Sequence, residues 1–481
     1  CCGRGGVGVA TPERGQGLTV HGSDPRDIHD VVHHAHCPFL SILMSAYKET
    51  AGVSQQDFNK AVSQLYRDAM ASDGEHGNWL GKLRAFLENV PLYLPSTRAE
   101  LIVLYALSRM VLGETSERAQ MLWEEVGKFS TLDLFGWLGT ALEWAAVMLS
   151  GGAFAFRPLP AGADVESYAV HALPCGSEGE DCQIRVMLLS DWGTGTPQAK
   201  ALVEKLAATG EPQCCLHLGD VYYSGLLHEQ ASYVTQVLKY ALPDGVPVFA
   251  IPGNHDYYSG GFGFFDELPK LSGVQESSFF CLRGKHWQLV CVDTGVNDSN
   301  PLVMALGESM THLDDGQRRW ARAMLAAGKA KGLKTILFSH HQLFSRKHSV
   351  GKAGHGVNPH LLETFKDQLA DVSAWFWGHE HACLAYEPFL GLERGRLIGF
   401  GAVPEWASND VFGANSTNDF SEYGGHPPEL VPGARYGKSG MIWNTGGAVL
   451  TLSAGSAKVE YYELPLGPHG APGDLGLFHT E

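Results

Sequence analysis

Short apolar runs alternate with longer amphipathic stretches over the second two-thirds of this chain. The runs consist mainly of β-branched and large apolar residues, and each is followed within two positions by Gly, Asp or Ser; they are residues 184–189, 246–251, 289–292, 335–338 and 374–376. Runs of this kind predict buried strands. The stretches between them place apolar residues at helical spacing and predict helices at 198–210, 233–242, 317–327 and 359–371.

The last apolar runs follow one another without an obvious helical stretch between them; they are residues 396–402, 448–453 and 459–464. Together with the earlier alternation of strand and helix, they predict a mixed α+β and α/β domain over residues 166–464. Residues 151–165 contain several Gly and Pro residues and are expected to be a linker. Residues 465–481 are also rich in Gly and Pro and are expected to be a tail.

The first 150 residues follow a different pattern. Residues 1–28 are Gly-rich and polar without periodicity, so they are expected to be a disordered lead-in. Residues 29–150 show apolar positions at helical spacing and predict an all-helical domain of unknown role. Their most apolar part, 131–149, contains Asp133 and Glu143, which favours a buried helix over a membrane span, with interfacial membrane binding as the alternative.

Composition narrows the classes of function. The 481 residues carry a formal net charge of −17, which argues against the basic face that nucleic-acid binding needs. Ten Cys do not form a disulfide scaffold in a chain of this length. Cys214, Cys215 and Cys291 fall in predicted strands and are expected to be core thiols, whereas Cys175 and Cys182 flank a turn and could pair in an oxidising compartment. No signal peptide is visible and the chain begins with Cys, so the sequence predicts no localisation.

Polar side chains that bind metals follow the predicted strands. They lie in six blocks: 190–193, 219–223, 253–256, 292–294, 339–341 and 378–381. Ligand groups collect at the carboxyl ends of strands in open α/β sheets. The groups present are carboxylate, phenol, amide and imidazole, a mixed oxygen and nitrogen set that suits two neighbouring cations sharing a bridging carboxylate.

These blocks resemble the calcineurin-like metallophosphoesterases and, among them, the purple acid phosphatases. The general pattern of that superfamily begins Asp-x-His, but the third position here is Gly193. The purple acid phosphatases instead have a Tyr three residues after the bridging Asp, and Tyr223 has that offset from Asp220. The resemblance covers about residues 184–464 and implies a two-sheet αββα sandwich, which the all-helical domain would precede.

The resemblance also implies the ligands of two metal ions. Metal one is expected to bind Asp191, Asp220, Tyr223 and His381. Metal two is expected to bind Asp220, Asn254, His340 and His379. A phenolate ligand favours Fe(III) at metal one, where it should absorb visible light, with Fe(II), Zn or Mn at metal two. Asp293 is expected to support the site without binding a metal.

Further residues are expected to contact the substrate. By resemblance, Asn254 and His255 bind phosphate, and His255 protonates the leaving alkoxide, with Asp256 as a candidate to orient it. His348 matches a second family His near the leaving group, with His355 in reserve, although its loop could also be a solvated surface loop. Three nearby basic residues are candidates to hold an anion: Arg346, Lys347 and Lys352.

The resemblance implies hydrolysis of phosphomonoesters by a hydroxide held on the two metal ions. One alternative is a phosphodiesterase or nucleotide hydrolase on the same metal site. Another, of a different class, is a membrane- or protein-docking module with vestigial activity. The expected partner is a phosphorylated small molecule; neither nucleic acid nor membrane contact is expected, and the partner of the helical domain is unknown. Residues 406–444 are long and polar and are expected either to wall the site or to form a surface excursion.

Overall fold

The computed structural model describes residues 128–129, 140, 143–144, 146–148, 154–174, 183–299, 311–350, 354–440, 442–467 and 471–481. The chain divides into two units, Cys1–Leu101 and Ile102–Glu481, and every described residue belongs to the second. The predicted lead-in, nearly all of the predicted helical domain and the Cys175–Cys182 pair therefore lie outside the described residues.

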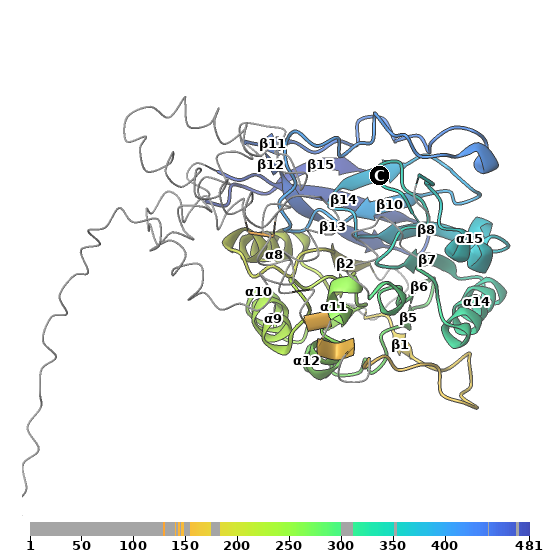
Figure 1. The fold of residues 1–481 in the computed structure, drawn as a ribbon. Coiled ribbons are helices and arrows are strands. Elements are labelled where there is room, and N and C mark those ends of the chain that lie inside the picture. The colour runs from red at the N-terminus through yellow and green to blue at the C-terminus, as the bar shows by residue number, and fades with distance from the viewer. Residues whose placement is uncertain are drawn as a thin grey trace, which may run out of the picture. The chain divides into compact units, whose positions relative to one another are not determined.

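Two β-sheets form the centre of the described part (Figure 1). The first has seven strands in the order β1 (Val170–Ala172), β5 (Phe280–Arg283), β6 (Trp287–Cys291), β7 (Lys334–Phe338), β8 (Val372–Trp377), β10 (Gly395–Ile398) and β9 (Cys383–Tyr386). The second has six, in the order β15 (Gly476–Thr480), β14 (Ala457–Leu464), β13 (Thr445–Leu452), β2 (Ile184–Leu189), β3 (Cys214–His217) and β4 (Val248–Ala250). A short pair, β11 (Lys438–Ser439) and β12 (Ile442–Trp443), completes the strands of this part.

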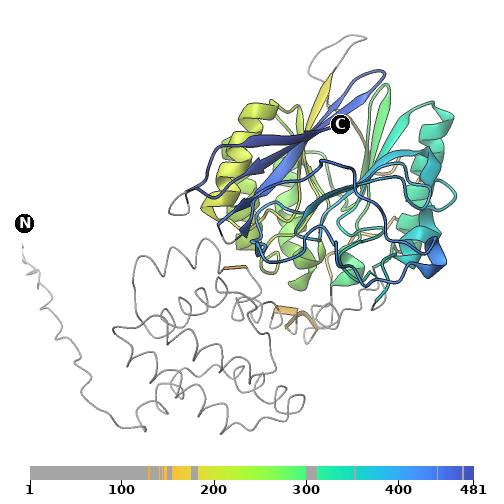
Figure 2. The ribbon, with the colours of Figure 1, turned by 90° about the horizontal axis from the view of Figure 1, so that it is seen from above.

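Helices lie outside both sheets (Figure 2). Beside the six-stranded sheet are α8 (Pro197–Gly210), α9 (Leu227–Glu229), the π-helix η2 (Gln230–Thr235) and α10 (Gln236–Ala241). Beside the seven-stranded sheet are α14 (Asp315–Ala330) and α15 (Pro359–Phe365). The remaining helices are α11 (Asn254–Tyr258), α12 (Phe262–Ser272), η3 (Val296–Asp298), η4 (Leu369–Asp371) and η5 (Ser421–Tyr423).

Alternating side chains of β2 show how the layers pack. Val186 and Leu188 point into the main apolar core together with side chains of the seven-stranded sheet, whereas Met187 and Leu189 pack with Leu202 under α8. Successive side chains of a strand point to opposite faces, so a strand buried on both sides is apolar throughout. This explains why the central strands appear in the sequence as continuous apolar runs.

Polar groups fix the ends of the long helices. Thr196 caps α8 by accepting a hydrogen bond from Ala199 N, and Pro197 occupies its first turn. Asp314 caps α14 by accepting hydrogen bonds from Gly316 N and Gln317 N. Such caps each stabilise a helix by about 1 kcal/mol, and they set where the chain leaves the preceding loop.

The predicted mixed α/β fold with two sheets is confirmed, and so is the burial of Cys214, Cys215 and Cys291 as free thiols. Two boundaries were wrong. Residues 476–480 of the expected tail form strand β15, which pairs with β14 and continues its hydrogen-bond ladder. The described part of the expected linker, from 154, packs Phe156 and Leu159 against the core. Among the described residues, no helix has the length and apolarity needed to cross a membrane.

Candidate metal centre

The carboxyl ends of five strands bring the predicted ligands together. Asp191 follows β2, Asp220 follows β3, Asn254 follows β4, His340 follows β7, and His379 and His381 follow β8. Strands β2, β3 and β4 are parallel neighbours, as are β6, β7 and β8, so each sheet delivers its polar loops at one edge. The side chains from the two sheets meet between these edges.

Three of these residues adopt a backbone conformation that L-residues rarely take. The φ angles are 53° at Asp191, 71° at Asp220 and 69° at His379. A non-glycine residue in this region costs of order 1–3 kcal/mol and persists where its surroundings hold it, often at a functional site. The fold therefore holds these three side chains in fixed directions at some cost in stability.

Glycines let the loops approach closely. A Cβ on Gly253 would lie 2.1 Å from Asp220 Oδ1, so any side chain there would displace the carboxylate. A Cβ on Gly193 would lie 2.8 Å from Val221 Cγ2. The backbone at 193 forms a parallel bridge to Val221, and Gly193 O accepts a hydrogen bond from Tyr222 N. The position that carries an imidazole in the Asp-x-His pattern thus has no room for one here.

The first cluster of donor atoms surrounds the hydroxyl of Tyr222. Tyr222 Oη lies 3.0 Å from Asp220 Oδ2, 3.2 Å from Asp191 Oδ1 and 3.0 Å from His381 Nε2. The His381 nitrogen is 3.7 Å from Asp191 Oδ1. Asp191 Oδ2 is held separately, because it accepts hydrogen bonds from Ser190 Oγ and His379 N. Two carboxylate oxygens and one imidazole nitrogen therefore surround the phenol oxygen of Tyr222.

The structure does not bring Tyr223 into this cluster, in contrast to the sequence-based expectation. Its ring stacks on Phe129 with centroids 4.4 Å apart, and its hydroxyl accepts a hydrogen bond from Phe129 N at 3.3 Å. The loop path after Asp220 turns the side chain of Tyr222 inward and that of Tyr223 outward. Offset along the chain alone cannot distinguish two adjacent tyrosines in a loop, because side-chain direction there depends on the backbone path.

The second cluster lies on the other side of Asp220. His340 Nε2 is 3.3 Å from Asp220 Oδ1, while its Nδ1 donates to Leu218 O at 2.8 Å. His379 Nδ1 is 3.0 Å from Asn254 Oδ1, and the Asn254 amide nitrogen donates to Tyr258 Oη at 2.6 Å. The two oxygens of Asp220 thus face different clusters.

The electrostatics of the buried groups fit a cation. Burial raises the pKa of Asp191 to about 7, although His340 opposes the shift. Burial also opposes ionisation of Asp220, but His340 and His255 hold its pKa well below its usual range. In turn Asp220 raises the pKa of His340 to about 9 against the effect of burial. Buried charges need pairing or a metal ion, and these oxygen and nitrogen donors suit divalent or trivalent ions.

His255 has one fixed nitrogen and one that faces the clusters. Its Nδ1 donates to Tyr223 O at 2.7 Å, and its Nε2 lies 3.9 Å from Asp220 Oδ2. The described hydrogen bonds of Asp256 are made with other groups. The Asp256 carboxylate instead accepts hydrogen bonds from Gly253 N, Asp220 N and Gln230 Nε2, so it braces the loops that carry the ligands.

The loop after His340 is hydrogen-bonded to residues 406–444, the segment expected to wall the site. The Arg346 guanidinium donates to Gly413 O and Pro428 O, and Lys347 Nζ pairs with Glu405 at 3.1 Å. Arg346 therefore joins the loop after His340 to residues 406–444. These hydrogen bonds do not show the predicted role of Arg346 in holding an anion.

The side chain of His348 is exposed, while its backbone N–H donates to Ser345 Oγ. The pKa of His381 is lowered to about 3, mainly by burial and to a smaller extent by the nearby Lys347 and His348. Asp293 contacts no donor cluster, but it accepts hydrogen bonds from Tyr257 Oη and Gly295 N. Lys352 lies outside the described residues.

Two residues near the site were missed by sequence reasoning. The buried carboxylate of Glu229 accepts hydrogen bonds from the backbone nitrogens of Tyr223, Ser224 and Leu226. No sequence pattern indicated this role, since it depends on a loop folding back onto a helix start. His341 lies against His340 and His379, with one nitrogen of each within 4.8 Å of the others. The adjacent His pair was its only signal.

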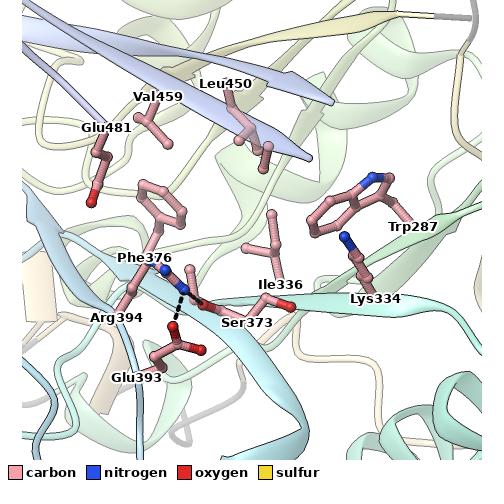
Figure 3. A pocket seen from close by; sticks show the side chains of 12 residues that line it. Trp287, Lys334, Ile336, Ser373, Phe376, Glu393, Arg394, Leu450, Val459 and Glu481 are labelled. Atoms are coloured by element: carbon pink, nitrogen blue, oxygen red, sulfur yellow. Dashed lines mark hydrogen bonds and ion pairs between the residues drawn. The ribbon is translucent and has the colours of Figure 1, made fainter. Parts of the chain in front are cut away.

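A cavity of about 560 Å³ lies at the opposite end of the sandwich (Figure 3). Trp287 and Lys334, at the amino ends of β6 and β7, line it together with Leu450 and Val459. Its cations have partners, since Arg394 pairs with Glu393 and Lys334 donates to Gly455 O. The cavity is separate from the donor clusters.

Residues 184–383 match the family of calcineurin-like phosphoesterases, a range that contains all the converging donors. The match indicates a metal-dependent phosphoester hydrolase. No curated protein sequence matches the chain.

The solved structures to which the chain is similar include the following three. The first is GAP50, the anchor in the inner membrane complex of Plasmodium: 15% identity, coverage of 62% of this chain and 88% of that chain, TM-score 0.41. The second is Vps29 of Chaetomium thermophilum: 10% identity, coverage of 62% and 97%, TM-score 0.26. The third is a putative 5′-nucleotidase from Staphylococcus aureus, in complex with alpha-ketoglutarate: 10% identity, coverage of 62% and 54%, TM-score 0.32.

Proposed function

We propose that this chain is a dinuclear-metal phosphomonoesterase of the purple acid phosphatase type. The observation that carries the proposal is the convergence of Asp191, Asp220, Tyr222 and His381 around one point, with a phenol in place of the imidazole that Gly193 excludes. The match of residues 184–383 to the calcineurin-like phosphoesterases supports the broader class of reaction.

Two sets of residues would hold the ions. The first set is Asp191, Asp220, Tyr222 and His381, with the tyrosine differing from the position that the sequence pattern favoured. The second set is Asp220, Asn254, His340 and His379. Asp220 belongs to both because its Oδ2 faces Tyr222 and its Oδ1 faces His340. A phenolate favours Fe(III) in the first set, and Fe(II), Zn²⁺ or Mn²⁺ would suit the second.

When bound, the ions supply charge that neutralises phosphoryl oxygens and lowers the pKa of water. The chain supplies orientation and proton transfer. Tyr223 O accepts the Nδ1–H of His255, and the Nε2 of the same ring lies 3.9 Å from Asp220 Oδ2, where it would exchange a proton with the leaving oxygen. Lys347 and His348 lie near enough to His381 to affect its pKa, so they would be placed to contact a substrate bound beside it.

The assay that tests the proposal compares p-nitrophenyl phosphate with bis-p-nitrophenyl phosphate over a range of pH, with metal analysis of the same samples. Saturable turnover of the monoester is expected, with loss of at least about 100-fold in Asn254→Ala because the second set then lacks its amide. The exposed His360 on α15 provides a matched surface control, His360→Gln, which should keep full turnover.

Two outcomes contradict the proposal and separate its rivals. Preferred turnover of the diester would favour a phosphodiesterase or nucleotide hydrolase on the same residues. Bound metals without turnover of either ester would favour a docking module with vestigial activity.

A further inference from the structure

A third imidazole lies beside the second donor cluster. The ring of His341 is centred 4.8 Å from that of His340 and 4.4 Å from that of His379. One nitrogen of each of the three rings lies within 4.8 Å of the other two. The His341 side chain is buried, with 2% of the residue exposed. The three rings therefore form one compact group, although the family resemblance implies only His340 and His379 as ligands.

Thr294 fixes the orientation of the His341 ring. Thr294 Oγ1 lies 2.9 Å from His341 Nδ1 and also accepts the backbone N–H of His341 at 3.0 Å. Metal-binding histidines nearly always have their second nitrogen held by such a neighbour, which sets the ring direction. His340 has the same arrangement, with its Nδ1 held by Leu218 O. This leaves the Nε2 atom of each ring, which lies 3.3 Å from Asp220 Oδ1 in His340 and 2.9 Å from Asp298 Oδ2 in His341.

The surroundings of His341 Nε2 favour a cation. The atom lies 2.9 Å from Asp298 Oδ2, yet it makes no hydrogen bond to any residue that the structure describes, so a proton on it would not point at that oxygen. His340 Nε2 faces Asp220 Oδ1 at 3.3 Å but likewise makes no hydrogen bond within the described part. Buried polar atoms without hydrogen bonds are costly, and a metal ion that several of them face satisfies them together.

We infer that His341 is an additional ligand of the second metal ion, through Nε2, and that the Asp298 carboxylate adjoins the same ion. The inference rests on the proposed dinuclear site and deepens it. Three imidazoles make this position rich in nitrogen, and imidazole ligands suit Zn²⁺ better than Mn²⁺ or Mg²⁺, which favour oxygen. His341 thereby sets which metal occupies the second position.

Metal competition tests the inference directly. Ion-free full-length protein is dialysed against equal concentrations of Zn²⁺ and Mn²⁺, and the metal content per chain is measured by plasma mass spectrometry. The native chain is expected to take Zn²⁺ at the second position. His341→Gln is expected to bind Zn²⁺ there about 10- to 100-fold more weakly and to admit more Mn²⁺. X-ray absorption at the zinc edge should show one imidazole fewer in the variant.

Two further variants complete the test. Asp298→Asn should also weaken Zn²⁺ binding but keep the imidazole count, because it removes charge and leaves the ring in place. His360→Gln, an exposed change on α15, should alter neither quantity. If His341→Gln does not fold, as judged by circular dichroism, the zinc-edge spectrum of the native chain still decides between two and three imidazoles at the second position.

The failure of this inference is distinguishable from failure of the proposed function. Equal zinc affinity and an equal imidazole count in the native chain and His341→Gln would overturn the role of His341 while leaving two bound ions. Three ions per native chain would overturn it in favour of a separate cation site. A native chain that binds no ions would remove the dinuclear site itself.

Discussion

Asp220 is the side chain on which both donor clusters depend. Its Oδ2 lies 3.0 Å from Tyr222 Oη, and its Oδ1 lies 3.3 Å from His340 Nε2. The positive φ of 71° aims the carboxylate between the two, and the hydrogen bond from Asp220 N to Asp256 Oδ2 at 2.9 Å helps to hold it there. The bridging role that we propose for Asp220 is therefore supported by its backbone conformation as well as by its charge.

The two adjacent tyrosines give a matched pair of variants. Tyr222→Phe should abolish the visible absorption expected of an iron–phenolate bond, because the Tyr222 hydroxyl is the one that faces Asp191, Asp220 and His381. Tyr223→Phe should keep the band, because its ring stacks on Phe129. The measurement is the absorption spectrum of iron-loaded protein; loss of the band in Tyr223→Phe alone would reverse the assignment.

Metal binding should depend on pH through His340 and Asp191. The pKa of His340 is raised to about 9 and that of Asp191 to about 7, so in the ion-free site at neutral pH His340 is protonated and Asp191 is protonated in about half of the molecules. Binding must displace these protons, so metal affinity should increase as pH rises from about 6 to 9. Calorimetry in buffers of different ionisation enthalpy should detect proton release; affinity that falls over this range would contradict the account.

The raised pKa of His340 also makes the stability of the ion-free protein depend on pH. Because the folded pKa of His340 lies above its unfolded value, its pairing with Asp220 stabilises the ion-free protein fully below about pH 6.5. That contribution is lost as pH rises through about 9.

For single residues, the sequence predicted the chemical groups of the candidate site better than it predicted which side chains point into the site. The carboxylates and imidazoles after the strands converge because strand ends fix their position. Tyr222 and His341 were not identified, because each lies in a loop next to the residue that the pattern favoured. Loop backbones decide which of two neighbours points inward, and hydrogen bonds such as those of Glu229 and Thr294 determine the loop path.

Glu229, in the first turn of the helical segment that begins at Leu227, connects the loops that carry the candidate ligands. Glu229 accepts hydrogen bonds from Tyr223 N at 2.6 Å, Leu226 N at 2.9 Å and Ser224 N at 3.1 Å. The next residue, Gln230, donates to Asp256 Oδ1, and Asp256 in turn holds Asp220 N. One short element thus braces the loops on both sides of Asp220.

Removing the Glu229 carboxylate should loosen this element. Glu229→Ala leaves three backbone N–H groups without their acceptor and should lower the free energy of unfolding by about 2–3 kcal/mol, measured by urea denaturation. It should also weaken metal binding by about 10-fold, as expected for a residue that supports ligands without contacting the ion. Glu229→Gln keeps one acceptor oxygen, so its stability and metal affinity should lie between those of the native chain and of Glu229→Ala. An unchanged metal affinity in Glu229→Ala would refute the bracing role.

Most strands could be predicted because continuous apolar runs are typical of strands buried on both faces. Strand β2 has the predicted bounds, Ile184–Leu189. The helix predicted at 233–242 corresponds to the end of η2 and to α10, and because these continue α9 without a break, the helical segment starts earlier, at Leu227. Strand β15 was missed because its residues are intermediate in burial or exposed and follow a Gly/Pro-rich stretch; only pairing with β14 makes it a strand.

On the scale of the whole described domain, the site is the place where two sheets meet. Three parallel strands from each sheet end at this edge, so ligands separated by up to 190 residues come together. Ions bound between the sheets would therefore tie the two layers to each other.

Chelation should measure how strongly the ions join the layers. With free metal at about 100 times its Kd, binding adds about 2.7 kcal/mol to stability, equivalent to a rise in Tm of roughly 5–10 °C. Removal of metal with a chelator should lower the Tm by that amount, and readdition should restore it. An unchanged Tm in protein shown to have lost its ions would contradict the coupling.

The most direct measurement is anomalous diffraction from crystals of the metal-replete protein at the iron and zinc absorption edges. The proposed dinuclear site predicts two peaks, one on each side of Asp220. One should lie among Asp191, Tyr222 and His381, and the other among Asn254, His340 and His379. Absence of both peaks, or a single ion away from Asp220, would contradict it.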